Sequence, residues 1–116
     1  MIAASSICAG CIAAIAAARA GAKVVLVEKM PVPGGTYTNG GIGANSFYAM
    51  STDPTTAKRT VGGIPYELNE ELVKAYGGTG YIPTPKDHHH SPYRFVGDHE
   101  VYKGVVSRML MDAGVK

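Results

Sequence analysis

Hydrophobic positions near the start of the chain follow the patterns of buried strands and of a closely packed helix. Ile2–Ala4 is a short apolar run, and Lys23–Glu28 is a β-branched run of the kind found in parallel sheets. Between them, Gly10–Ala20 is rich in alanine and precedes Gly21, a residue that suits the left-handed position after a helix. The pattern therefore predicts that the chain opens with a strand, a helix and a second strand.

A second helix is predicted to begin with Pro65 in its first turn, because proline suits the first helical position. Gly77-Gly78 should end this helix, since adjacent glycines disfavour its continuation. Its buried face is predicted to carry Leu68, Leu72 and Ala75 or Tyr76.

A third helix is predicted after Asp98, a residue that can cap a helix N-terminus, and should extend to about Ala113. Gly114 would end it, and Val115 would begin a new strand. The inward-facing positions at helical spacing are Val101, Val105, Met109 and Ala113.

The middle of the chain shows neither the helical nor the strand period. Residues 30–63 form a glycine-rich segment that is predicted to be a long loop, either ordered or functional. Residues 79–97 are dense in proline and histidine and are predicted to be irregular. The glycines of the first segment include Gly34-Gly35, Gly40-Gly41, Gly43 and Gly62-Gly63.

The length of 116 residues allows one domain and is too short for two. We expect an α/β fold with a strand-helix-strand unit over residues 1–29, the glycine-rich loop over residues 30–63 and a helical remainder over residues 64–116. The whole of 1–116 is predicted to be one domain.

The charge pattern argues against nucleic-acid and membrane partners. The net charge is only +2, and lysines and arginines are scattered without a basic run. The uncharged stretch Met1–Ala18 is mostly alanine and leads directly into Arg19, so we interpret it as a strand and a helix and not as a membrane span. No basic residue precedes it, which disfavours a signal peptide. We expect a cytoplasmic protein.

A strand, a tight turn, a helix and a second strand that ends at an acidic residue form the dinucleotide-binding arrangement. Here Gly10 stands at the start of the helix and Glu28 at the end of the second strand. The helix N-terminus offers N–H groups and partial positive charge to a pyrophosphate, and the carboxylate accepts hydrogen bonds from ribose hydroxyls. These two residues alone are equally consistent with an ordinary strand-helix-strand unit.

Longer segments resemble FAD-dependent oxidoreductases, a family that includes flavoprotein disulfide reductases and fumarate reductases. Residues 15–29, Ile-Ala-Ala-Ala-Arg-Ala-Gly-Ala-Lys-Val-Val-Leu-Val-Glu-Lys, resemble the first helix and second strand of that family. Pro33-Gly34-Gly35-Thr36, followed by Thr38 and Gly40-Gly41-Ile42, resembles its next cofactor loop. Gly62-Gly63-Ile64-Pro65 and Asp98–Val115 are similar to the branch named simply FAD-dependent oxidoreductase, so the resemblance covers nearly the whole chain.

This resemblance implies a Rossmann-type unit that binds the ADP part of FAD, with hydride chemistry performed by the flavin. Family members are several-fold longer and supply the third strand, the substrate domain and the catalytic residues, so we expect an incomplete N-terminal portion whose substrate is unknown. No catalytic or metal-binding residue is predicted. The cofactor-binding residues implied are Ser5, Ile7, Gly10, Glu28, Lys29, Gly34, Gly35, Thr36, Thr38, Gly41 and Ile42.

The turn before the first helix departs from the family pattern. The family has Gly-x-Gly-x-x-Gly, whereas this sequence has Ser5-Ser6-Ile7-Cys8-Ala9-Gly10 and retains only the last glycine. At the second position the backbone must touch phosphate, and the β-branched side chain of Ile7 occupies that space. We therefore expect weak FAD binding.

Two other constellations carry alternative functions. Cys8 and Cys11 have the spacing and position of a thioredoxin-like thiol pair, although we expect both to be small buried hydrophobic residues. His88-His89-His90 could offer metal ligands, but three adjacent histidines do not point to one site from a regular element, and a solvated loop is expected. A small thiol redox protein and a non-catalytic interaction module remain alternatives to FAD binding.

Overall fold

The computed structural model describes residues 2–4, 8–40, 44–45, 58–84 and 93–116. Its helices and strands confirm the predicted α/β class. Backbone contacts divide the chain into two compact units, which are described separately below. Unit 1 comprises residues 1–42 and 99–116, and unit 2 comprises residues 43–98.

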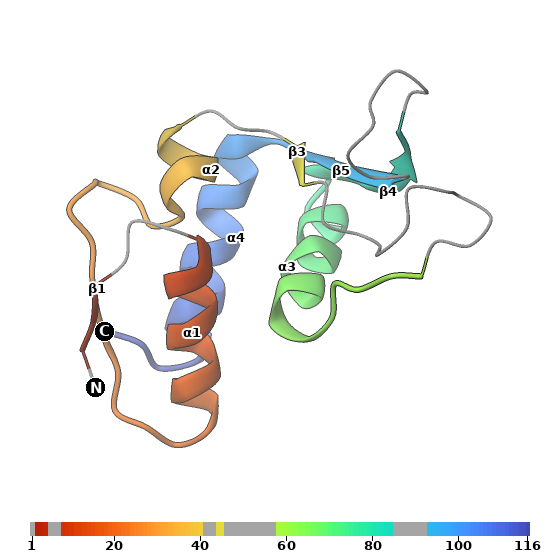
Figure 1. The fold of residues 1–116 in the computed structure, drawn as a ribbon. Helices are drawn as coiled ribbons and strands as arrows, with labels where there is room; N and C mark the ends of the chain where they lie inside the picture. The colour runs from red at the N-terminus through yellow and green to blue at the C-terminus, as the bar shows by residue number, and fades with distance from the viewer. Residues whose placement is uncertain (1, 5–7, 41–43, 46–57, 85–92) are drawn as a thin grey trace. The chain divides into compact units, whose positions relative to one another are not determined.

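Unit 1 opens with the predicted strand-helix-strand arrangement (Figure 1). Strand β1 (Ile2–Ala4) pairs in parallel with β2 (Val25–Val27), and α1 (Cys8–Arg19) connects them. Helix α1 packs on both strands, and its small residues Cys11 and Ala14 are fully buried together with Ile15. Their size lets the helix lie close to the sheet.

The second strand was predicted from a β-branched run typical of buried parallel strands, and the structure buries one of its faces. Val24 is 3% exposed, whereas Val25 and Val27 are 44% and 53% exposed. Alternate residues of a strand point to opposite faces of the sheet, so the two exposed valines share the face that no described helix covers.

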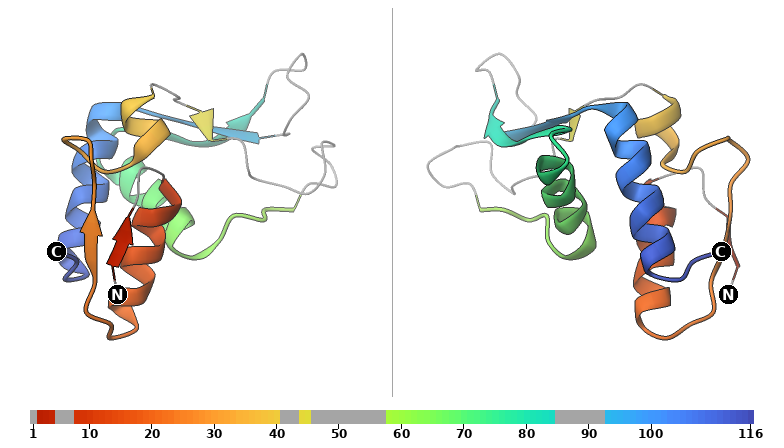
Figure 2. Two further views of the ribbon diagram at one scale, coloured as in Figure 1. Left: turned by 60° about the vertical axis from the view of Figure 1, so that its left-hand side comes forward. Right: turned by 180° about the vertical axis from the view of Figure 1, so that it is seen from behind.

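The remaining elements of unit 1 are the short helix α2 (Gly35–Asn39) and the long helix α4 (His99–Asp112). Helix α4 contacts both α1 and α2, and it runs beside α1 in both figures (Figures 1 and 2). The predicted inward positions Val105 and Met109 are buried, whereas Val101 and Ala113 are half-buried. The full set of buried residues in α4 is Tyr102, Val105, Val106, Met109 and Leu110.

Lys116, four residues after the end of α4, forms hydrogen bonds with β2, next to Val115, where a new strand was predicted to begin. The Lys116 N–H donates to the Val24 carbonyl at 3.1 Å, and the Leu26 N–H donates to the Lys116 carbonyl at 2.7 Å. This alternation is that of a parallel strand pair. Because β1 uses the other edge of β2, the second strand lies between β1 and Lys116.

Unit 2 is an antiparallel sheet with one described helix packed against it. The strand order is β3 (Ala44–Asn45), β5 (Tyr93–Gly97) and β4 (Gly78–Pro83), and α3 (Gly63–Lys74) packs on β4. Figure 1 shows α3 along one face of this sheet. The buried side chains between them include Leu68 and Leu72, as predicted, and Phe95.

The prediction of irregular structure over residues 79–97 is wrong, because this segment contains most of β4 and all of β5. The first part of β4 is distorted by a register shift between Gly78 and Tyr81, where Gly80 has φ 70°. The hydroxyl of Thr79 accepts the Val96 N–H at 3.1 Å, so a side chain replaces a ladder carbonyl. Pro83 is tolerated because β4 is an edge strand.

Three helices end with the same pair of backbone hydrogen bonds around a left-handed residue. That residue is glycine after α1 and α4, namely Gly21 and Gly114 with φ 90° and 80°. After α3 it is Tyr76, with φ 58° and 98% of its surface exposed, and not one of the predicted glycines. Gly78 serves packing instead, since an added Cβ would overlap the Phe95 ring.

No helix within the described ranges is long and apolar enough to cross a membrane.

Candidate functional site

The carboxyl ends of β1 and β2 bring two predicted site residues to one edge of the parallel sheet. Ala4, the last residue of β1, pairs with Val27, the last residue of β2. Helix α1 begins shortly after β1, and Glu28 directly follows β2. The first turn of α1, which contains half-buried Gly10, and the carboxylate of Glu28 therefore start from the same edge.

The Glu28 carboxylate is half-satisfied. Its Oε1 accepts a hydrogen bond from the Met30 N–H at 2.9 Å. Its Oε2 is buried and has no hydrogen-bond partner among the described residues. Because a buried polar atom without a partner costs free energy, Oε2 would gain from accepting a hydrogen bond from a ligand hydroxyl. The neighbouring predicted residue Lys29 is exposed.

The Gly34-Gly35 turn has a backbone conformation that strongly favours glycine. Both residues are buried and have positive φ angles, 115° and 56°. A Cβ built on Gly34 would lie 2.5 Å from Thr38 Cγ2 and 3.0 Å from Tyr102 Cε1. The close approach of α2 to α4 thus requires the absence of a side chain at this position.

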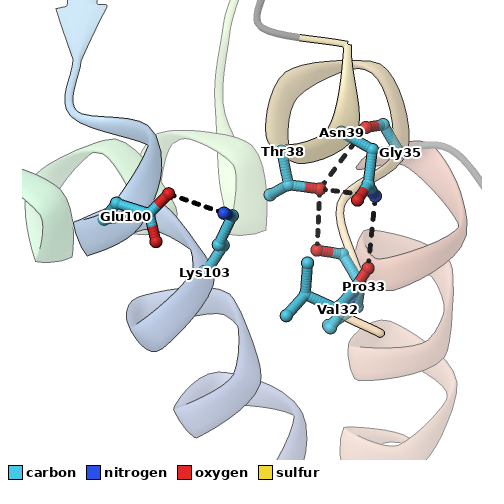
Figure 3. Close-up of polar contacts among 7 residues, drawn as sticks. All are labelled: Val32, Pro33, Gly35, Thr38, Asn39, Glu100 and Lys103. Carbon is cyan, nitrogen blue, oxygen red and sulfur yellow. Dashed lines mark hydrogen bonds and ion pairs between the residues drawn. The ribbon is translucent and has the colours of Figure 1, made fainter. Parts of the chain in front are cut away.

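Two side chains of α2 form hydrogen bonds with backbone carbonyls of the loop that precedes it (Figure 3). The Thr38 hydroxyl points to the carbonyls of Pro33 and Gly35, with Oγ1 at 3.1 Å and 3.3 Å from them, and accepts a hydrogen bond from Asn39 Nδ2 at 3.1 Å. Asn39 Nδ2 also lies 3.3 Å from the Val32 carbonyl. Thr38 is buried and holds the glycine turn, whereas Thr36 is exposed.

Aromatic rings attach α2 to the first turn of α4. The Tyr37 ring centroid lies 4.2 Å from that of Tyr102 and 5.3 Å from that of His99 in an edge arrangement. His99 Nε2 is buried and has no hydrogen-bond partner among the described residues. This aromatic cluster was not predicted from the sequence. The three-residue spacing of His99 and Tyr102 was the available signal, because it places both rings on one helix face.

The structure also bears on the two alternative sites predicted from the sequence, the cysteine pair and the histidines. Cys11 is fully buried, as expected, which removes it from thiol exchange with a partner in this conformation. Among the residues with described placement, no group of three or more His, Cys, Asp or Glu side chains could hold a metal ion. Several predicted features lie outside the described residues: the Cys8 side chain, the three histidines at 88–90, and the site residues Ser5, Ile7, Gly41 and Ile42.

Comparison with known proteins gives one family match. Residues 6–116 match the family model described as FAD dependent oxidoreductase. The match spans most of the chain and includes the first helix, the glycine turn and the last helix. FAD is the cofactor that this family implies. No curated protein matches the sequence.

Proposed function

Because the chain belongs to the FAD-dependent oxidoreductase family, we propose that unit 1 binds the ADP part of FAD as the N-terminal cofactor-binding portion of such an enzyme. The cofactor would lie at the edge where β1 and β2 end and α1 begins. The flavin would supply the hydride chemistry when bound, and the residues of this chain would hold and orient it.

The unpartnered Oε2 of Glu28 is the observation that carries the proposal. A ribose hydroxyl can donate to this oxygen, while Oε1 remains bound to the Met30 N–H and keeps the carboxylate oriented. The residue stands directly after β2, where the dinucleotide-binding arrangement places a ribose-binding acid.

Helix α1 would bind the pyrophosphate through the N–H groups of its first turn, including that of Gly10. A helix N-terminus carries about half an elementary positive charge. The first turn of α1 contains no acidic residue that would oppose a phosphate. The helix is twelve residues long, so its N-terminal field is fully developed.

The glycine turn would approach the phosphates next to this helix. Helices α1 and α2 are in contact, so the turn that precedes α2 belongs to the same end of unit 1. Gly34 and Gly35 offer backbone without side chains, and exposed Thr36 offers a hydroxyl. We assign Thr38 a positioning role, because its hydroxyl is engaged within the loop. Ser5, Ile7, Lys29, Gly41 and Ile42 remain in the proposed site from sequence alone.

The test is a calorimetric FAD titration of the wild type and of a variant that carries Ser5→Gly and Ile7→Gly. The wild type should bind FAD weakly or not at all, because Ile7 stands at the position where the family has glycine. The double variant should bind measurably more tightly. Adding Glu28→Gln to it should cost about 1 to 3 kcal/mol of binding free energy, the scale of leaving a ligand hydroxyl without its hydrogen-bond partner.

Glu70→Gln is the matched control, since Glu70 is an exposed carboxylate on α3 in unit 2 and should leave FAD affinity unchanged. If circular dichroism shows that the double glycine variant is folded and calorimetry detects no FAD binding, the proposed cofactor binding is refuted. The interaction module would then replace it as the best description of the chain.

A further inference from the structure

Unit 2 holds two buried polar atoms that nothing in the described part of that unit satisfies. They are Nε of Arg94, in β5, and Oγ1 of Thr84, the residue after β4. Folded proteins pair the great majority of buried polar atoms. The guanidinium is always charged, so an unpaired buried N–H of Arg94 is especially costly.

Both atoms belong to the face of the sheet opposite α3. The Tyr81 side chain is on the face of the sheet that packs against α3, because its hydroxyl accepts a hydrogen bond from Asn69 Nδ2 of α3 at 2.7 Å. Phe95 pairs with Tyr81 and is therefore on the same face. Arg94 pairs with Ile82 and thus projects to the other face. Thr84 directly follows β4 and comes two positions after Ile82, so continued strand alternation places it on the side of Arg94.

The acidic residues of unit 2 do not neutralise this arginine within the described structure. Glu67, Glu70 and Glu71 are all on α3, against the opposite face, and Glu71 forms an ion pair with Lys74 at 2.6 Å. Asp98 follows β5 on the side of Arg94, but four extended residues separate their Cα atoms by about 13 Å. No ion pair of Arg94 occurs among the described residues.

We propose that Arg94 and Thr84 form a binding site for the carboxylate group of a small molecule, separate from the FAD site of unit 1. The Nε edge of a guanidinium presents two parallel N–H groups that match the two oxygens of a carboxylate. The Thr84 hydroxyl would donate a further hydrogen bond. One positive charge balances a carboxylate monoanion, whereas a phosphate dianion would retain an uncompensated charge at a partly buried position.

The test is an NMR titration of the full chain with sodium acetate, with sodium chloride replaced mole for mole so that ionic strength stays constant. The side-chain Nε–H signal of Arg94 reports directly on the proposed hydrogen bond. It should move downfield and saturate. Sodium phosphate at the same ionic strength should bind at least about fivefold more weakly, because its second charge has no partner in the site.

Three variants distinguish a built site from general attraction to arginine. Arg94→Lys keeps the charge and loses the two-pronged edge, and should weaken acetate binding about tenfold or more. Thr84→Val keeps the shape, loses the hydroxyl and should weaken binding about threefold to tenfold. Arg59→Lys is the control, because Arg59 is an exposed arginine of the same unit, with its Cζ 3.7 Å from the centroid of the Tyr66 ring. This change should alter the acetate affinity by no more than about twofold.

The proposal is overturned if the Arg94 signal does not respond, if all arginine signals respond alike, or if phosphate binds more tightly than acetate. It is also overturned if Thr84→Val, which introduces no new charge, is folded and binds acetate as the wild type does. FAD binding by unit 1 has a separate readout in calorimetry, so failure of either proposal leaves the other standing.

Discussion

The two units of this chain differ in strand direction and in how their strands are connected along the sequence. Unit 1 builds a parallel sheet whose strands come from the start of the chain and from its last described residue, with α4 returning from the far end of the sequence. Unit 2 builds an antiparallel sheet from one continuous stretch, residues 43–98. Parallel strands require long connections, whereas antiparallel strands follow each other through turns.

Each unit has a charged side chain with one unsatisfied buried atom, and the two side chains are opposite in charge. Unit 1 leaves a carboxylate oxygen of Glu28 at the end of a strand, and unit 2 leaves a guanidinium nitrogen of Arg94 on the face of a sheet. The first favours a ligand that donates hydrogen bonds, and the second favours a ligand that accepts them. The two proposed sites would therefore recognise ligands of opposite hydrogen-bonding character.

The variant with the largest expected effect tests whether the two units unfold independently. Phe95→Ala removes the largest fully buried side chain of unit 2 and should cost about 3 to 5 kcal/mol of unfolding free energy. Amide hydrogen exchange should accelerate in β4, β5 and α3, while α1 keeps its protection. Ile15→Ala in α1 is the reciprocal control, with the opposite pattern. Equal acceleration of exchange in both units would show that they unfold as one.

A smaller effect is expected at the glycine turn of unit 1. Gly34→Ala should cost about 2 kcal/mol in urea unfolding, because the residue has φ 115° and its Cβ would meet Thr38 and Tyr102. Gly104→Ala is the matched control, since Gly104 lies inside α4 with open space around it. That change should add about 0.5 to 1 kcal/mol. Equal loss from both variants would contradict the assigned strain.

The end of α3 offers a gain in unit 2. Tyr76 adopts a left-handed conformation that costs most residues about 1 to 2 kcal/mol, and its side chain is almost entirely exposed. Tyr76→Gly should therefore raise the stability of unit 2 by about 1 kcal/mol in urea unfolding. Gly114→Ala makes the reverse change after α4 and should lower the stability of unit 1. A neutral result at both positions would mean that these helix ends are frayed.

The smallest effect concerns a surface ion pair of unit 2. The hydrogen bond that the Lys74 ammonium donates to Glu71 Oε1, followed by the negative charge of Glu71, raises the pKa of Lys74 above its ordinary value. The stability from this pair is complete below the unfolded pKa of 10.5 and is lost as pH rises through the raised pKa of the folded state. In an NMR titration, Glu71→Gln should lower the pKa of Lys74 by more than Glu70→Gln does. Equal shifts would contradict the hydrogen bond.

The elements that could be predicted from the sequence are those encoded within a short window. The run at Val24–Val27, the alanine-rich helix and the Leu68–Leu72 spacing each specify their element locally. Strands β4 and β5 could not be predicted in this way, because the bulge at Gly80 and the proline at position 83 interrupt the two-residue alternation. Their pairing with each other is set by tertiary contact.

The candidate site shows the same division. The position of Glu28 after β2 followed from spacing, and the structure adds that one of its carboxylate oxygens is unpartnered. The hydrogen bond of the Thr38 hydroxyl to the Pro33 carbonyl could not be predicted from the sequence pattern. The contact of Tyr37 with His99 could not be predicted either, because these residues lie in two distant segments of the chain. Local sequence identifies acids and glycines, and packing decides which of their atoms stay available.

The hydrogen bonds of Lys116 to β2 have a consequence for how the chain acquires its structure during translation. Residues 43–98 leave the ribosome as one block and contain β3, β4 and β5, the described strands of their sheet, so unit 2 can fold as soon as they emerge. Strand β2 must wait for α4 and Lys116 before its second edge is paired. Strand β2 is synthesised before unit 2 but gains this partner only after it, and its open edge is exposed to other chains in the interval.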